Sequence, residues 1–152
     1  MKTLRNMIPL MIIIVVVAGV VYAKFDRVED AIRYRQAVMV LIGQHFGRMA
    51  EVVKGSQAFD QSTFEKETDV LETLATLPWE AFLYPGSDRG KTQLKSKALE
   101  NREDFMTAAR EFEQQTADLA VVARKGDLEA VKAQVGAVAQ TCKGCHGTYR
   151  SR

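Results

Sequence analysis

Four stretches of the chain place apolar residues at alternating steps of three and four positions, the period of an amphipathic α-helix. They cover about 28–54, 63–77 and 101–125, and a fourth stretch starts after Asp127. Gly55, Pro78 and Gly126 stand directly after the first three stretches, and such residues end helices. After the first 23 residues, no stretch shows the alternation of a β-strand. The pattern therefore predicts an all-α protein, an antiparallel four-helix bundle.

The helix starts are predicted from side chains that can accept a hydrogen bond from the first turn. The candidate N-cap residues are Asp26, Ser62, Asn101 and Asp127. A glutamate follows the first two at the capping-box spacing of three residues. Residues 83–98 show no clear period, so we expect a long, solvent-exposed connection there. Its lysines and Arg89 could dock a partner, although a solvated loop is the simpler interpretation.

The first 23 residues differ from the rest of the chain. Lys2 and Arg5 precede an uncharged apolar run that ends at the small residue Ala23, which is the pattern of a secretory signal peptide. Cleavage would leave residues 24–152 as one domain. An uncleaved anchor is the alternative, because the run is just long enough to span a bilayer. Removal of residues 1–23 lowers the net charge from +2 to zero, so nucleic-acid binding is not supported.

The fourth stretch carries the candidate chemistry. Its apolar seam consists of Leu128, Val131, Val135, Val138, Cys142 and Cys145. These cysteines are the only two in the chain, and His146 follows the second. Because both cysteines continue the seam, any group attached to them would lie between the helices.

Two interpretations of the CKGCH segment fit the chain poorly. A structural zinc site needs four ligands, and His45 is the only other histidine. A thiol oxidoreductase would use Cys142 and Cys145, but such pairs start a helix in a fold with strands, where the helix dipole lowers the thiol pKa. Here the pair is predicted near the C-terminal end of a helix, where the dipole disfavours a thiolate.

The third interpretation is covalent haem attachment, for which C-x-x-C-H is the sequence signature. Cys142 and Cys145 are about one helical turn apart and can meet the two vinyl groups on one edge of a porphyrin. His146 would then reach the iron as its proximal ligand. We therefore predict one haem c, joined through both cysteines, in the core of the bundle.

Only six residues follow His146, so a sixth iron ligand would have to come from an upstream helix. The 28–54 stretch aligns Arg35, Met39, Ile42 and Phe46 along one stripe. Arg35 and Gln36 could hold a haem propionate by charge-assisted hydrogen bonds, or they could lie on a solvated helix face. Met39 could coordinate the iron or pack in the core. Phe82 could pack against the haem edge or simply fill the core.

Three segments, VEDAIRYRQAVMVLIGQHFGRMAEVVKG, LATLPWEAF and CKGCHGTYR, resemble cytochrome c′, the four-helix-bundle class of c-type cytochromes, in their order and separation. The resemblance covers essentially all of residues 24–152 and is weak only over 83–101. It implies haem joined through Cys142 and Cys145, His146 as proximal ligand, and the propionate contact described above. It also implies that Arg150 lies beside the proximal face.

The same resemblance implies a five-coordinate, high-spin iron in a crowded apolar pocket that binds nitric oxide and carbon monoxide but holds oxygen poorly. The protein would be a periplasmic homodimer packed through its first two helices, and free of the membrane once the signal is cleaved. It would exchange electrons with an unidentified redox partner or scavenge nitric oxide, and would not be a conventional enzyme. Low-spin members of the fold use a first-helix methionine as sixth ligand, so an electron carrier with Met39 coordinated is the alternative. A thiol oxidoreductase is the alternative from another class.

Overall fold

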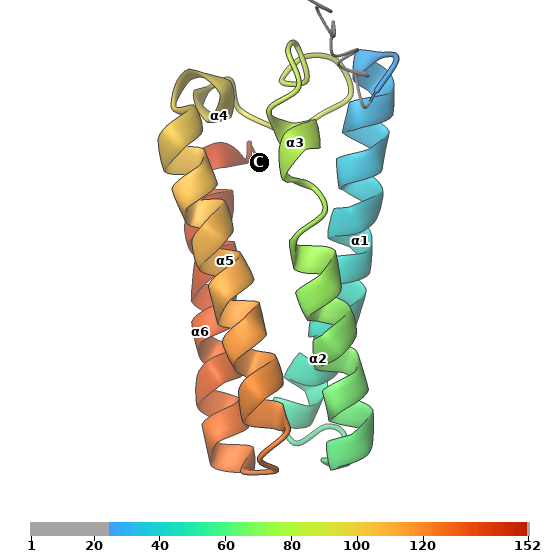
Figure 1. The fold of residues 1–152 in the computed structure, drawn as a ribbon, viewed down its shortest axis with the longest axis vertical. Helices are drawn as coiled ribbons and strands as arrows, with labels where there is room; N and C mark the ends of the chain where they lie inside the picture. Colours follow the sequence, from blue (N-terminus) through green and yellow to red (C-terminus); the bar gives the residue numbers. More distant parts are fainter. Residues whose placement is uncertain (1–24, 152) are drawn as a thin grey trace, which may run out of the picture.

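The computed structural model describes residues 25–151, so the predicted signal peptide lies outside the described residues. The helices are α1 (Val28–Val53), α2 (Gln61–Ala75), α3 (Trp79–Phe82), α4 (Lys97–Glu100), α5 (Arg102–Ala123) and α6 (Leu128–Tyr149). The four long helices run alternately up and down as an antiparallel bundle (Figure 1). Residues 25–151 contain no strand, only an isolated bridge between Leu94 and Arg150. The predicted all-α four-helix bundle is confirmed.

The core forms where the apolar stripes of the long helices face one another. Its buried members include Val38, Met49, Phe64, Leu71, Phe105, Phe112, Leu119, Val131, Val135 and Val138. Helix α5 packs closely against α6, and α2 packs against both α1 and α5, whereas α1 and α6 touch more sparsely. The side of the bundle between its first and last helices is therefore the least tightly packed.

Within residues 25–151, no helix is both long and apolar enough to cross a bilayer.

The two glycines predicted to end helices do so in the left-handed conformation that only glycine adopts readily. Gly55 has φ of 81° and Gly126 has φ of 70°, as expected for the residue just past a helix C-terminus.

The predicted N-caps are partly confirmed. The Asp127 carboxylate accepts hydrogen bonds from the N–H groups of Glu129 and Ala130 at 3.0 and 3.2 Å, so it caps α6 as predicted. Asn101 precedes α5, but its side chain makes no capping hydrogen bond.

The other two N-cap predictions are wrong by one or two residues. Helix α2 is capped by Asp60, which accepts from the N–H of Thr63 at 2.8 Å, and Ser62 lies inside the helix. Helix α1 is preceded by Arg27 in extended conformation, without a side-chain cap, so Asp26 stands one residue too early. Several adjacent polar residues could cap each helix, and the sequence does not rank them.

The connection over 83–98 is less exposed than predicted. Ser87 is fully buried, and α4 begins at Lys97. The connection also pairs with the end of the chain, because the N–H of Lys95 donates to Tyr149 O at 2.9 Å and that of Ser151 donates to Gln93 O at 2.8 Å. The prediction of a purely solvated connection is wrong, because contacts distant in the sequence hold its backbone. Its cationic side chains are nevertheless exposed.

Candidate functional site

The CKGCH segment lies in the last turns of α6, which continues without a break to Tyr149. Cys142 and Cys145 are half-buried and pack against the hydrophobic core. Because Val131, Val135 and Val138 are buried on the same seam, the helix turns both sulfurs toward the interior. The structure thus brings the two cysteines together on the core side of the helix, as the sequence predicts.

The surroundings of the two cysteines keep their thiols protonated. Burial raises the pKa of Cys142. Burial, together with the neighbouring Cys142, raises the pKa of Cys145 to about 11. A reactive redox thiol needs a lowered pKa, so this environment argues against the thiol oxidoreductase alternative.

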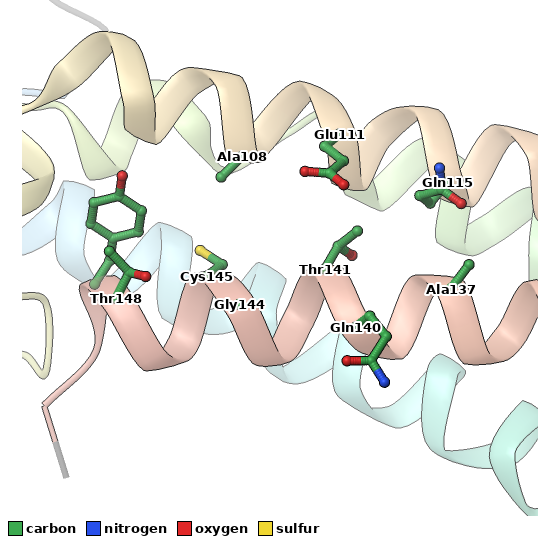
Figure 2. A pocket seen from close by; sticks show the side chains of 10 residues that line it. Ala108, Glu111, Gln115, Ala137, Gln140, Thr141, Gly144, Cys145 and Thr148 are labelled. Atoms are coloured by element: carbon green, nitrogen blue, oxygen red, sulfur yellow. The ribbon is translucent and has the colours of Figure 1, made fainter.

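A pocket of about 540 Å³ opens beside Cys145, between α5 and α6. Figure 2 shows the Cys145 sulfur directed toward α5, near Ala108. Most residues of the wall carry polar side chains, among them Glu111, Gln115 and Gln140, and the small residues Ala108, Ala137 and Gly144 contribute to the rest. The volume falls in the range of small-molecule and cofactor pockets. Cys142 and His146 do not line it.

His146 lies toward the outer side of α6 and is exposed as a whole residue. Partial burial of its ring, with a smaller effect of the Arg150 charge, lowers the pKa of His146. The imidazole is therefore neutral at pH 7, which leaves a nitrogen lone pair free to bind a metal. The other histidine, His45, lies elsewhere, between α1 and α2, with Nδ1 2.6 Å from Glu67 Oε2.

Arg35 is buried, in contrast to the alternative interpretation that it lies on a solvated helix face. Only 2% of the residue is exposed, and its guanidinium donates to Ala81 O (3.0 Å), Ser87 O (2.6 Å) and Thr92 Oγ1 (2.7 Å). Burial lowers the pKa of Arg35 to about 10, so the group remains charged at pH 7. The solvated-face interpretation is wrong for Arg35.

Gln36 is exposed, and its Nε2 donates to Lys91 O at 3.0 Å. Together with its neighbour Arg35, it ties α1 to the 83–98 connection. The hydrogen bonds of Arg35 and Gln36 to this connection use some of the N–H groups that were predicted to bind a haem propionate. The buried guanidinium of Arg35 has no hydrogen bond to a described carboxylate, so a propionate would still stabilise its charge.

Two other candidate residues, Met39 and Phe82, pack against the core. Met39 is half-buried on α1, next along the helix to the buried Ile42. The Phe82 ring lies 5.0 Å from the Arg35 guanidinium carbon, measured to the ring centroid, and stacks on Trp79 at 6.0 Å. Phe82 is therefore a core aromatic residue on α3.

Arg150 follows α6 and is exposed. Its backbone N–H donates to His146 O at 3.1 Å, whereas its Nε donates to Gln93 Oε1 at 2.8 Å. Arg150 is therefore close enough to His146 to influence its charge state, while its side chain holds the 83–98 connection.

Two features near the site were not predicted from the sequence. Tyr149 is buried and makes an edge contact with Phe105, with ring centroids 5.1 Å apart. It stands four residues after Cys145, so an extension of the apolar seam would have found it. The indole Nε1 of Trp79 is buried without a hydrogen-bond partner among the described residues. The sequence pattern cannot indicate whether a buried indole N–H has a hydrogen-bond partner.

Together, these features fit a covalently held haem. Two protonated thiols three residues apart pack against the core, and a neutral imidazole is next to the second. The unpartnered Trp79 N–H also points to a polar group that the polypeptide alone does not supply.

Comparisons with known proteins agree on one family. A family model described as Cytochrome C' matches residues 30–150. A cytochrome c' from Alcaligenes xylosoxydans xylosoxydans is 36% identical over 129 residues, 85% of this chain and 99% of that protein. The structure of cytochrome c prime from Shewanella frigidimarina has a TM-score of 0.82 at 35% identity, and the match covers 84% of this chain and 99% of that one. Two structures of variants of the Alcaligenes xylosoxidans protein match at 36% identity over 85% of this chain. One has carbon monoxide bound, with a TM-score of 0.79 and 100% of its chain covered, and one is a nitric oxide complex, with 0.80 and 99%.

Proposed function

This chain belongs to the cytochrome c′ family, and we propose that it is an exported haem protein whose five-coordinate, high-spin iron binds nitric oxide and carbon monoxide. In this role it takes part in electron transfer or nitric oxide scavenging, without turning over a substrate as an enzyme does. Haem c is the cofactor of the family. The observation that carries the proposal is the CKGCH segment on the core-facing seam of α6, with both thiols half-buried and protonated.

Cys142 and Cys145 would hold the haem through two thioether bonds. Each thiol adds across one vinyl group, its sulfur bonding to one vinyl carbon and its proton going to the other. The addition consumes no oxidant or reductant. His146, neutral at pH 7, would be the proximal ligand. When bound, haem c supplies an iron that accepts one electron and binds diatomic gases.

The other side of the iron would be covered by α1. Met39 and Ile42 carry no hydrogen-bond donor, and a polarised dioxygen ligand needs one, whereas nitric oxide binds without it. The nitric oxide and carbon monoxide complexes of the Alcaligenes xylosoxidans variants support the proposed gas binding. Arg35, with its neighbour Gln36, would meet a propionate, and Arg150 would lie beside the proximal ligand. Phe82 would pack near the haem edge from α3.

The direct test is mass spectrometry of the native exported protein together with its visible spectrum. We expect the peptide that contains Cys142 and Cys145 to carry the mass of one haem. The reduced protein should show a high-spin spectrum that changes when nitric oxide is added. A colourless protein with two titratable thiols would contradict the proposal and favour the thiol oxidoreductase.

A six-coordinate electron carrier is the second candidate, because Met39 packs against the same core as both cysteines. The variant Met39→Leu tests it, with Met49→Leu as a control, since Met49 is a core methionine of the same helix. If Met39 coordinates the iron, a low-spin signal of the parent protein will be lost in Met39→Leu and kept in the control. A high-spin parent protein would exclude this alternative.

A homodimer packed through α1 and α2 also forms part of the proposal. Large apolar side chains are exposed on α1 (Val40 62%, Leu41 47%), on α2 (Val70 40%) and just after α2 (Leu77 37%). Such residues mark protein contacts when they gather on one surface. We expect Val40→Lys/Val70→Lys to sediment as a monomer. The control Val121→Lys, on α5 and 51% exposed, should remain a dimer. A dimer in the double variant would contradict the proposed interface.

The proposed location is the periplasm, on the basis of the signal-like residues 1–23. N-terminal sequencing of the protein from a periplasmic fraction should begin at Lys24. A protein that retains residues 1–23 and sediments with membranes would be an anchored form.

A further inference from the structure

Six exposed cations gather on two segments that the fold brings together. They are Arg89, Lys91, Lys95, Lys97, Lys143 and Arg150. The first four belong to residues 86–97, and the last two belong to 141–151. We call the surface of these two segments the basic end surface. It lies at the end of the bundle that carries α3, α4 and the C-terminus (Figure 1).

Hydrogen bonds hold the two segments in a fixed arrangement. Besides the two backbone bonds already described, Arg150 Nε donates to Gln93 Oε1 at 2.8 Å, and Lys95 Nζ lies 3.3 Å from Gly147 O. The backbone of residues 93–95 is therefore fixed against residues 147–151, and this contact brings the two cation-bearing segments side by side.

The charge of this surface is not balanced locally. Residues 25–151 contain 17 Lys and Arg and 19 Asp and Glu, and the two segments take six of the cations but only one carboxylate, Asp88. The rest of the described chain is left with 11 cations and 18 carboxylates. None of the six cations forms an ion pair with another described residue, whereas six of the other 11 do. Burial, together with the nearby carboxylate of Asp104 close to the start of α5, raises the pKa of Tyr149, so an acidic group borders the surface on the α5 side.

The basic end surface includes the haem-attachment segment itself. Lys143 stands between the two cysteines, and Arg150 follows His146 by four residues. A partner bound here would lie directly against the helix turns that hold the haem. An electron donor needs this proximity to the haem, which is why the position of the surface favours a redox protein as the partner.

We propose that the basic end surface docks an acidic electron-transfer protein that reduces the haem. This inference rests on the proposed haem function. One electron passes from the reduced centre of the partner to the ferric iron, so the partner is oxidised by one electron, the iron is reduced by one, and no atoms are exchanged. Opposite charge steers such an encounter and orients the two proteins before transfer.

The test compares the holoprotein with Lys91→Glu/Lys97→Glu, whose two side chains are exposed and make no described contact. The matched control is Lys66→Glu/Lys125→Glu, because these lysines are also exposed but belong to the first turns of α2 and to the connection between α5 and α6. Figure 1 shows that the start of α2 and this connection lie at the end of the bundle opposite α3 and α4. Oxidation of the reduced proteins is followed by stopped flow at low ionic strength with anionic ferricyanide and with cationic tris(phenanthroline)cobalt(III). Both are one-electron oxidants. Circular dichroism first confirms that each variant is folded.

We expect the first variant to react with ferricyanide at least about tenfold more slowly and to react faster with the cobalt complex. The control should change by less than about twofold. A second measurement follows the backbone amide resonances of the ferrous carbon monoxide complex, which is diamagnetic, during addition of poly-L-glutamate. The addition should shift mainly residues 86–97 and 141–151, and less so at high salt.

Equal rates in the two variants, or shifts spread over the whole surface, would overturn this proposal alone, since both measurements use a protein already shown to contain haem. Tighter binding to a DNA oligonucleotide or to phosphatidylglycerol vesicles than to poly-L-glutamate would overturn the assignment of a protein partner. Absence of covalent haem would instead overturn the proposed function, before these experiments begin.

Discussion

Replacing Arg35 by methionine tests how a buried guanidinium shapes the end of the bundle that carries the haem segment. Methionine keeps much of the length and the apolar stem of arginine but donates no hydrogen bond. The variant leaves three acceptors, Ala81 O, Ser87 O and Thr92 Oγ1, without their donor. It also removes the cation that lies over the Phe82 ring.

The expected loss of stability follows from opposing contributions. Three hydrogen bonds from a charged donor contribute about 1.5–3 kcal/mol each, and the contact with an aromatic ring adds about 1 kcal/mol. Desolvation of the buried guanidinium costs several kcal/mol and offsets part of this stabilisation. Methionine carries no charge, so the variant does not incur the desolvation cost. We therefore expect Arg35→Met to lower the free energy of unfolding by about 2–4 kcal/mol. With a urea m-value of about 2 kcal/mol/M, the midpoint would fall by about 1–2 M.

The assay is urea unfolding of the holoprotein, followed by circular dichroism. The control is Arg33→Met on the same helix, because the Arg33 side chain is 66% exposed and pairs only with Asp30. Arg35→Lys should recover only part of the loss, since an ammonium cannot reproduce the planar fork of the guanidinium.

A local measurement separates this mechanism from general destabilisation. Arg35 holds the 83–98 connection, so trypsin should cleave after Arg89 and Lys91 faster in Arg35→Met than in the parent protein under native conditions. An Arg35→Met midpoint within about 0.3 M of the control, with unchanged cleavage, would refute the reasoning.

Three further predictions concern groups outside that connection. Burial alone raises the pKa of Glu67, but hydrogen bonds from α1 side chains outweigh it and lower the pKa below 4.5. Its stabilising contribution is therefore present above pH 4.5 and is lost as the pH falls through the lowered folded value. Glu67→Gln should lower the unfolding free energy by about 1 kcal/mol at pH 7 and by much less near pH 3, whereas Glu72→Gln should have little effect at either pH. A loss that is independent of pH would contradict the assigned ion pair. Asp127→Ala should cost about 1 kcal/mol by thermal unfolding because it removes a formed N-cap, and Asn101→Ala should cost only a few tenths, so equal losses would contradict the capping assignment. His146→Ala should keep covalent haem but change its spin state and weaken gas binding, and an unchanged spectrum would rule out His146 as proximal ligand.

The helices and the attachment motif could be predicted from the sequence because their determinants are local. An apolar period, a glycine with positive φ or two cysteines three residues apart is defined within one or two helical turns. The same reasoning placed Cys142 and Cys145 on the core side of α6, and it would have included Tyr149 had the seam been followed one step further. It was less exact for the caps of α1 and α2, where adjacent polar residues compete.

Only the tertiary structure decided where Arg35 donates, because its three acceptors lie 46, 52 and 57 residues along the chain. The same holds for the basic end surface, where Arg150 meets Gln93 across 57 residues. Whether a charged side chain is solvated or buried depends on which distant segments pack over it and on whether they offer hydrogen-bond partners. Local sequence sets which residues share a helix face, but the desolvation and charge of a site arise only when those faces meet.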